Sequence, residues 1–278
     1  MQLANRAALI TGAGRGIGRA IALAYAKEGA RLALAARTVS ELQETAHLTE
    51  ALGAPTCIIC TDVADPTQVD AMVRQTLERF STLHILVNNA AMLGPVEPLW
   101  ETAIAAWVQT IQVNLIGTYL CCRAVLPVML AQGYGKIINV TSGARVRGRA
   151  VFTRRHQTAY YASKAAITQV TELLAHQVSH QPIQVNAMSP GGRTRMTEGL
   201  VEQAQAIGDT DLAALTQQVI AADPRERSAV LAVFLASDAS GTLSGRVLSY
   251  ADDFDSLSSR IQGIMASDAY TLRRVEEA

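Results

Sequence analysis

The amino-acid sequence predicts an α/β protein in which helices cover both faces of a doubly wound parallel sheet. Short apolar runs alternate with longer stretches of helical periodicity, and a glycine-rich run follows the first apolar run. The 278 residues contain no low-complexity linker, and a hydrophobic fraction of 49% is sufficient for one large core. We therefore expect one domain over residues 1–252, followed by a C-terminal extension over residues 253–278.

The first half of the chain gives four strands and three helices. Continuous apolar runs predict strands over residues 7–11, 31–36, 56–60 and 83–87. After the glycines, apolar residues recur at helical spacing until Gly29, which ends the first helix. Two more helices are expected over residues 39–52 and 66–80, and Asp65 caps the second of them.

The second half continues the alternation with longer helices. The expected elements are a helix over 103–130, a strand over 136–140, a helix over 158–178, a strand over 183–187, a helix over 225–235 and a strand over 246–250. In a doubly wound sheet, ligands bind beyond the carboxyl ends of the strands. Gly12, Asn88, Ser142 and Pro190 each follow a predicted strand, so we expect these four segments to meet at one crevice.

Tyr160 and Lys164 are four residues apart, so a helix places both side chains on one face. A phenol normally loses its proton near pH ~10. A fixed ammonium nearby lowers that pKa, and such a pair can donate and accept a proton. Tyr161 stands at the wrong offset for Lys164. In isolation, the pair is also consistent with an ordinary amphipathic helix.

The glycine-rich run, Thr11 to Gly18, lies between a predicted strand and a predicted helix. Backbone N–H groups and the helix dipole at such a position can hold a pyrophosphate, and therefore a dinucleotide. Glycine runs also form ordinary tight turns, so this feature has two interpretations until other motifs are added.

With these residues, the chain resembles the short-chain dehydrogenase/reductase family over roughly residues 7–248, in particular its NADP-preferring carbonyl and 3-oxoacyl reductases. The motifs that carry the resemblance appear in the family's order: Thr11 to Gly18, Asp62-Val63, Asn88-Asn89-Ala90, Asn114, Ser142, Tyr160 to Lys164 and Pro190-Gly191. The resemblance implies a one-domain Rossmann fold, a nicotinamide cofactor, and oxidation of a hydroxyl or reduction of a carbonyl.

The resemblance also implies roles for individual residues. Tyr160 would be the general acid/base, Lys164 would hold the nicotinamide ribose and lower the pKa of Tyr160, and Ser142 would hydrogen-bond the substrate oxygen. Asn114 would support a water that relays protons to Lys164. The implied cofactor contacts are Gly12, Arg15, Gly16, Ile17, Gly18, Arg37, Asp62, Val63, Asn89, Ala90, Tyr160, Lys164, Pro190 and Gly191. Asp62 has a second interpretation, as the cap of a turn.

Charge near the glycines indicates which dinucleotide binds. In NAD-selective folds an acidic residue ~20 positions beyond the glycines holds the ribose 2′-hydroxyl, whereas arginine accommodates a 2′-phosphate. No acid lies between Glu28 and Glu41, while Arg15 and Arg37 are placed to flank that phosphate. We therefore predict NADP in preference to NAD, with solvated arginines as the alternative interpretation.

An arginine-rich segment leads into Tyr160 and is longer than the corresponding segment of most family members. Its five arginines are Arg145, Arg147, Arg149, Arg154 and Arg155. They suggest an anionic substrate or carrier, because guanidinium groups bind carboxylates and phosphates. Alternatively, they could pair with Asp252, Asp253 and Asp255, remain solvated or form a subunit contact.

Three positions depart from the family's pattern. Ala91 stands where glycine is usual, which would narrow the space near the cofactor. Thr194 comes one place early, so its contact to the nicotinamide carboxamide is in doubt. Asp252-Asp253-Phe254 replaces a common Asp-Gly-Gly, and a tail follows that could cap the site or a neighbouring subunit.

Other classes of protein are disfavoured. Cys57 and Cys60 have metal or redox spacing but would point to opposite faces of a strand, and we interpret His176 and His180 as helix-surface residues, so no metal is predicted. Zero net charge argues against a general nucleic-acid binder. We expect no signal peptide, no apolar run of ~18 residues that suggests a membrane span, and a cytoplasmic location.

The predicted function is hydride transfer between NADP(H) and a small carbonyl compound or secondary alcohol. Reduction of 3-oxoacyl groups on an acyl carrier is one alternative, and a catalytically silent dinucleotide-binding regulator is another. The apolar, acid-free stretch over 103–130 suits a subunit interface, so we expect a homodimer or homotetramer.

Overall fold

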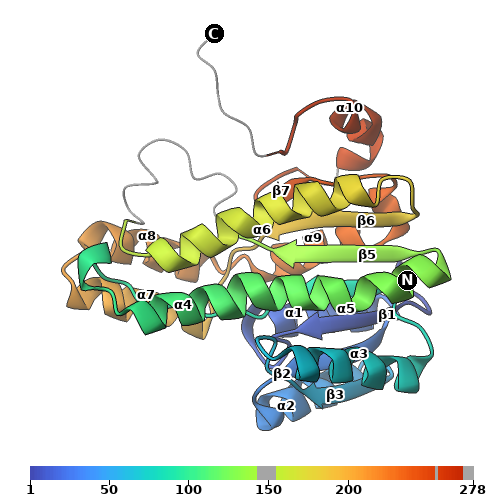
Figure 1. The fold of residues 1–278 in the computed structure, drawn as a ribbon, viewed down its shortest axis with the longest axis horizontal. Helices are drawn as coiled ribbons and strands as arrows, with labels where there is room; N and C mark the ends of the chain where they lie inside the picture. Colours follow the sequence, from blue (N-terminus) through green and yellow to red (C-terminus); the bar gives the residue numbers. More distant parts are fainter. Residues whose placement is uncertain (143–154, 254–255, 272–278) are drawn as a thin grey trace.

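The computed structural model describes residues 1–142, 155–253 and 256–271, and a seven-stranded parallel sheet forms its centre (Figure 1). The strand order is β3-β2-β1-β4-β5-β6-β7, and every neighbouring pair is parallel. The strands are β1 (Ala7–Thr11), β2 (Arg31–Ala36), β3 (Thr56–Cys60), β4 (Ile85–Asn88), β5 (Gly135–Val140), β6 (Ile183–Ser189) and β7 (Val247–Ser249). The order reverses between β1 and β4, which creates a crevice at their carboxyl ends.

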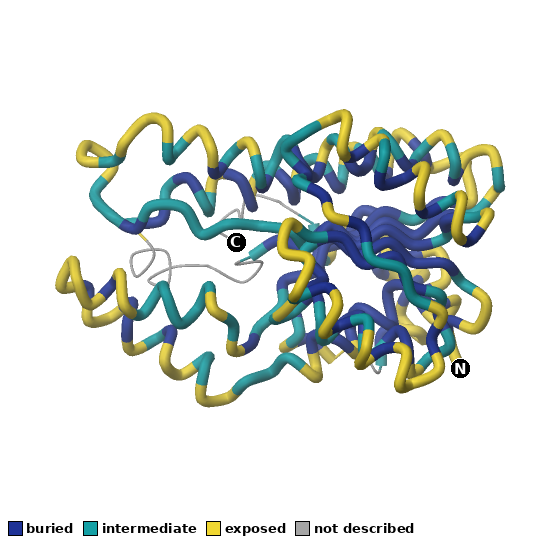
Figure 2. The backbone as a smooth tube through the Cα atoms, turned by 90° about the horizontal axis from the view of Figure 1, so that it is seen from below, coloured by how far each residue is buried: buried dark blue, intermediate teal, exposed yellow. Residues whose placement is uncertain are grey.

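The central strands are buried along their whole length, as continuous apolar runs require. All residues of β1, β4 and β5 are buried. Figure 2 shows these strands as a dark, buried layer between helices whose outer faces are exposed. A parallel sheet covered on both faces explains why its strands lack polar alternation.

Helices form one layer on each face of the sheet. One apolar cluster includes residues of α1 (Gly16–Lys27), α2 (Val39–Glu50) and α9 (Arg225–Ala236). The other includes residues of α3 (Pro66–Phe80), α5 (Gly117–Gln132) and α6 (Thr158–Gln177), which lie in front of the sheet in Figure 1. The doubly wound fold predicted from sequence is therefore confirmed.

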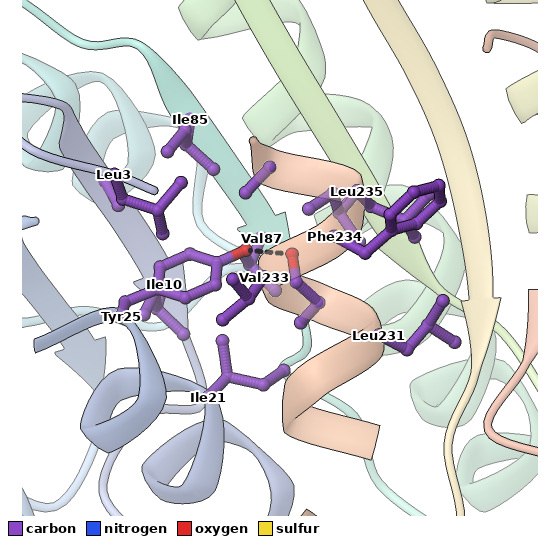
Figure 3. Close-up of a cluster of buried hydrophobic side chains, with 14 of the residues drawn as sticks. Leu3, Ile10, Ile21, Tyr25, Ile85, Val87, Leu231, Val233, Phe234 and Leu235 are labelled. Carbon is purple, nitrogen blue, oxygen red and sulfur yellow. Dashed lines mark hydrogen bonds between the residues drawn. The ribbon is translucent and has the colours of Figure 1, made fainter. Parts of the chain in front are cut away.

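Figure 3 shows the core between α1, α9 and the sheet. Tyr25 of α1 is fully buried there, and its hydroxyl donates a hydrogen bond to the carbonyl oxygen of Ala232 in α9, with 3.0 Å between the oxygens. Burial raises the pKa of this phenol well above its usual value, so it remains a neutral donor. Ile10 and Val87 from neighbouring strands pack in the same cluster.

The long helix expected over 103–130 is interrupted. The structure contains α4 (Ile104–Ile111), a π-helical turn (Gln112–Ile116) and α5. By length and composition alone, the combined segment from Ile104 to Gln132 is apolar enough to cross a membrane, so the expectation of no such run was wrong. Cys121, Val125 and Met129 nevertheless pack in the core, as expected of a core helix.

Sequence periodicity missed two helices between β6 and α9, α7 (Arg195–Ala206) and α8 (Thr210–Ala222). They pack mainly on each other and on Val96, in a small cluster separate from the sheet. Near the C-terminus, α10 (Ile261–Met265) places Ile261 and Ile264 in the apolar cluster that contains α1 and α9. The described part of the C-terminal extension thus packs on the domain.

Candidate active site

A crevice of about 550 Å³ lies beyond the carboxyl ends of the strands. In Figure 1, β1 and β5 point towards the side of the molecule where α7 and α8 lie. The residues predicted for the site that line this crevice are Gly12, Arg15, Gly16, Ile17, Arg37, Asp62, Val63, Asn89, Ala90, Ser142, Tyr160, Lys164, Pro190 and Gly191. Most of the predicted site therefore meets in one place.

The glycine loop is shaped for close approach of a ligand. Gly12 and Gly16 have φ values of 64° and 57°, which L side chains rarely adopt. At Gly12, a Cβ would lie 2.8 Å from Asn89 Nδ2. Arg15 precedes α1 and makes no side-chain capping bond within the described structure, so amides of the first turn are available to a phosphate.

Gly18 has a different position from the other glycines. It does not line the crevice among the described residues, and a Cβ there would collide with the Gly12 carbonyl and the Asn89 amide. Its missing side chain instead lets α1 pack closely against the end of β1, which is the role of the third glycine in dinucleotide folds.

Arg19 holds the glycine loop in place, a role that the sequence did not indicate. Its Nε donates to the Gly14 carbonyl oxygen at 3.1 Å and to Thr45 Oγ1 at 3.0 Å. Its two terminal nitrogens each lie 2.8 Å from a carboxylate oxygen of Glu44. This bidentate pair fixes the guanidinium under the loop.

Asn88 is the last residue of β4 and Asn89 follows it, and the two side chains lie in different surroundings. Asn88 was expected at the crevice, but its side chain is buried and donates to Asn139 Oδ1 at 2.9 Å, so that prediction was wrong. The reason is the pleat, which directs the last residue of β4 into the interior. Asn89 lines the crevice and also donates to the carbonyl oxygens of Thr11 and Gly12 at 2.9 and 3.1 Å.

Glu41 of α2 reaches the crevice and contacts two arginines. Its Oε1 lies 2.9 Å from Arg15 Nη1 and 3.0 Å from Arg195 Nη1, and all three residues line the crevice. An acidic group therefore stands beside Arg15, although none lies in the sequence between Glu28 and Glu41. Arg15 is only half exposed in this contact, with 51% of its side chain accessible.

Asp62 and Val63 line the crevice beyond β3, beside Arg37. Asp62 Oδ1 also accepts a hydrogen bond from the Ala64 amide at 3.0 Å, which forms a local turn. The turn that Asp62 caps is therefore present, and its contact with the adenine stays a prediction.

Tyr160 and Lys164 lie on α6, and Ser142 follows β5 at the same crevice. Lys164 Nζ lies 5.7 Å from the centre of the Tyr160 ring and donates to the Val140 carbonyl oxygen at 2.7 Å. Lys164 is buried, and this desolvation lowers the pKa of its ammonium to about 8. The ammonium is thus held next to the phenol at a site where its charge is weakly screened.

Asn114 does not line the crevice among the described residues but lies behind it, fully buried in the π-helical turn. Its side chain accepts from the Met92 amide at 2.8 Å and donates to the Met92 carbonyl at 3.0 Å. It also donates to Ser163 Oγ at 3.1 Å, and Ser163 in turn donates to the Tyr160 carbonyl at 2.6 Å. Asn114 thereby links the loop after β4 to the helix that carries Tyr160.

The helices that sequence analysis missed form an apolar wall of the crevice. Met196, Leu200, Leu212, Leu215 and Val219 of α7 and α8 line it. Thr194, which was doubtful as a site residue, lines the crevice and caps α7 by accepting from the Thr197 amide at 3.1 Å. A Thr-x-x-Thr capping box preceding α7 is the sequence signal that could have revealed this helix.

Two further positions from the sequence predictions line the crevice. One is Ala91, where glycine is usual in the family. The other is Tyr161, whose ring lies edge-on to that of Tyr160 with 5.3 Å between their centres. Tyr161 is therefore a crevice residue despite its wrong offset from Lys164.

The arginine-rich segment lies mostly outside the described residues, including Arg145, Arg147, Arg149 and Arg154. Arg155 is described, and its Nη2 lies 3.3 Å from Asp209 Oδ2, a partner that the sequence did not predict. His156 Nδ1 lies 3.0 Å from the same oxygen. Asp209 also caps α8, so the start of α6 is tied to the apolar wall.

The fold and this crevice define a dinucleotide-dependent oxidoreductase. A family model described as short chain dehydrogenase matches residues 6–205, and the chain belongs to the short-chain dehydrogenase/reductase family. Members of this family use NAD or NADP and act on small molecules, so the chain is an oxidoreductase enzyme.

The names of similar proteins indicate several different substrates. The chain is 38% identical to a sorbitol dehydrogenase of Cereibacter sphaeroides over 69% of this chain and 72% of the relative. It is 35% identical to a 3-oxoacyl-[acyl-carrier-protein] reductase of Synechocystis over 71% and 78%. The crystal structure of an NAD⁺-bound xylitol dehydrogenase superimposes with a TM-score of 0.81 at 29% identity, covering 90% of this chain and 98% of that one.

Proposed function

We propose that this enzyme transfers a hydride between NADP(H) and a carbonyl compound or secondary alcohol, with Tyr160, Lys164, Ser142 and Asn114 as its catalytic set. The observation that carries the proposal is the convergence of Ser142, Tyr160 and Lys164 on the crevice that the glycine loop also lines. A proton donor, a hydrogen-bond donor and a phosphate cradle thus share one cavity.

The residues present fit a dinucleotide. The positive φ angles of Gly12 and Gly16 leave a cradle without side chains, and the N-terminus of α1 presents amides to it. Gly12, Gly16 and Ile17 would hold the pyrophosphate, Asp62 and Val63 the adenine, and Lys164 the nicotinamide ribose. Hydride exchange at the carbonyl carbon is the chemistry that the bound nicotinamide supplies.

The protein's own residues would manage the proton and the developing charge. In reduction, negative charge builds on the carbonyl oxygen, so Ser142 donates a hydrogen bond to it and Tyr160 donates the proton. The Lys164 ammonium stabilises the phenolate that remains on Tyr160. Asn114 supports a water that returns a proton to Lys164 and fixes the backbone of Tyr160 through Ser163.

The preference for NADP rests on Arg37 and Arg15, which line the crevice at the end expected to hold the adenosine. Glu41 shares Arg15, and its carboxylate would repel a 2′-phosphate while Arg15 and Arg37 attract it. Glu41 therefore reduces the preference for NADPH over NADH that Arg15 and Arg37 create.

Cofactor titrations of single variants test this balance. Arg37→Gln should raise the Kd for NADPH by roughly ten- to a hundredfold, because a charge-assisted hydrogen bond is lost. Glu41→Gln should lower that Kd several-fold, and both variants should change the Kd for NADH by less than about threefold. Fluorescence of the bound reduced nicotinamide provides the measurement.

Arg193→Gln is the matched control, because Arg193 pairs with Glu198 at 2.8 Å and does not line the crevice among the described residues. It should leave both dissociation constants unchanged. Tighter binding of NADH than of NADPH by the unmodified enzyme would overturn the cofactor proposal.

Reduction of 3-oxoacyl thioesters is the second candidate function. The apolar wall formed by α7 and α8 is suited to an acyl chain, and the Synechocystis relative carries that name. A screen of neutral ketones, keto acids and acyl thioesters with NADPH separates the candidates. The family assignment argues against the alternative of a catalytically silent regulator.

We further propose that the enzyme is cytoplasmic and has a single domain over residues 1–252. We also propose that it forms a homodimer or homotetramer through α5 and α6. Tyr119 and Leu173 on these helices are 51% and 56% exposed despite their apolar character. Replacing both with glutamate should reduce the molar mass measured by light scattering. Val230→Glu on α9, at the opposite face, is the control and should leave it unchanged.

A monomeric unmodified enzyme, or an oligomer that survives the double replacement, would contradict the assembly proposal.

A further inference from the structure

Gln157 is a buried polar residue at the crevice to which the proposed mechanism gives no role. It directly precedes α6, three residues before Tyr160, and lines the same cavity with 1% of its surface exposed. Its side-chain Nε2 has no hydrogen-bond partner within the described structure. An amide NH₂ group donates two hydrogen bonds, and leaving a buried donor unpaired is costly.

Among the described residues, no ordinary structural contact uses Nε2 of the Gln157 side chain. Gln157 occupies the N-cap position of α6, and its carbonyl oxygen accepts from the Tyr161 amide at 3.0 Å. Its side chain makes no capping bond among the described residues. The flanking polar side chains pair with others: His156 contacts Asp209, and Thr158 Oγ1 accepts from Trp107 Nε1 at 3.3 Å.

Gln157 lies close in the chain to Tyr160, the proposed proton donor. Gln157 precedes Tyr160 by three residues at the start of α6, and both residues line the crevice. The apolar wall of the same crevice includes Leu200, Leu212 and Leu215. A substrate that matches both the apolar wall and the Gln157 amide has an apolar body and a hydrogen-bond acceptor oxygen. That oxygen lies within a few bonds of the carbonyl oxygen that Tyr160 protonates.

We propose that Gln157 selects the substrate by donating a hydrogen bond from Nε2 to a second oxygen close to the reacting carbonyl. The substrate class is then α-oxygenated carbonyl compounds, in which a hydroxyl, keto or carboxylate oxygen lies beside the reduced group. This assignment rests on the carbonyl reductase function proposed above. It makes Gln157 a specificity residue rather than a proton donor.

Three ketones with one phenyl body test the assignment. Acetophenone has a single oxygen, α-hydroxyacetophenone adds a hydroxyl, and phenylglyoxylate adds a carboxylate. Gln157→Met keeps the length of the side chain and removes both donors. It should lower kcat/KM for the two oxygenated ketones by about tenfold or more and change that for acetophenone by less than about twofold.

The two oxygenated ketones identify the kind of acceptor. Loss confined to phenylglyoxylate assigns a carboxylate, and loss confined to α-hydroxyacetophenone assigns a hydroxyl. Thr158→Ala is the matched control. Thr158 lies in the same turn of α6 but does not line the crevice among the described residues, so its replacement should affect all three ketones alike. Gln157→Glu, which turns a donor into an acceptor, serves if the methionine variant does not fold.

The outcomes separate this assignment from the proposed function. An equal change for all three ketones, or an unchanged ratio between them, overturns the role of Gln157 while reduction itself stands. If the unmodified enzyme with NADPH reduces no carbonyl compound, the proposed function fails, and the assignment of Gln157 fails with it.

Discussion

Replacing Lys164 with methionine is expected to lower kcat/KM by about 10³-fold, whereas the same replacement at Lys136 should leave it within about threefold. Both lysines are buried, and burial lowers the pKa of each to about 8. Lys164 lines the crevice beside Tyr160, whereas Lys136 lies near the opposite end of β5 and donates to Ser240 Oγ at 3.0 Å. Steady-state assays at pH 7, where both ammonium groups are mostly charged, give the comparison.

The same pair of variants predicts a separation of activity from stability. In the cofactor-free protein the pKa of Lys164 is about 8 when folded and near 10.5 when unfolded, so the unfolded chain binds more protons between these values. Stability contributed by this group therefore rises as pH increases from 8 to 10.5, and the cost of burying its charge is fully present below pH 8. Removing it relieves a cost on the order of a few kcal/mol.

Lys164→Met also loses the hydrogen bond to Val140, which offsets part of that gain. The free energy of unfolding at pH 7, measured with urea, should therefore be no lower than in the unmodified protein. The rise in stability between pH 8 and 10 should also become shallower. A large loss of stability at pH 7, or equal loss of activity in both lysine variants, would contradict this account.

The second large effect is expected at Tyr160. Tyr160→Phe removes the proposed proton donor and should lower kcat by about 10³- to 10⁴-fold. Tyr161→Phe is the matched control, because its ring lies edge-on to Tyr160 and lines the same crevice, whereas Lys164 Nζ lies 5.7 Å from the centre of the Tyr160 ring. It should retain activity within about fivefold.

Binding of NADPH distinguishes loss of chemistry from loss of the site. Its Kd should stay within about threefold in both tyrosine variants, since each keeps the ring and loses one hydroxyl. Activity of Tyr160→Phe comparable to that of Tyr161→Phe would remove Tyr160 from the mechanism.

The sequence predicted the sheet because its apolar strands are local and continuous, and it predicted the glycine loop because backbone conformation selects glycine at Gly12 and Gly16. It also placed Tyr160 and Lys164 on one helix face, since that relation depends only on spacing. The crevice-lining residues at the ends of β5 and β6 follow from the parallel topology.

The missed features depend on contacts between distant segments. Glu41 and Arg15 are 26 residues apart, and their contact follows from how α2 packs beside the glycine loop. Helices α7 and α8 bury their apolar residues against each other rather than against the sheet, so the alternation of strands and helices did not indicate them. The interior position of Asn88 depends on the pleat of β4. That Gln157 Nε2 has no partner in the described part of the chain depends on the shape of the cavity.

Transfer of deuterium tests the central claim most directly. Unmodified enzyme, supplied with NADPH deuterated at C4 on the transferred face and a reducible ketone, should give an alcohol that carries the deuterium on the former carbonyl carbon. Tyr161→Phe should give the same labelled product, and Tyr160→Phe should give almost none in the same time. Hydride transfer would be contradicted if the alcohol carried no deuterium whichever face of the nicotinamide was labelled. Equal labelling by the two tyrosine variants would contradict the role of Tyr160.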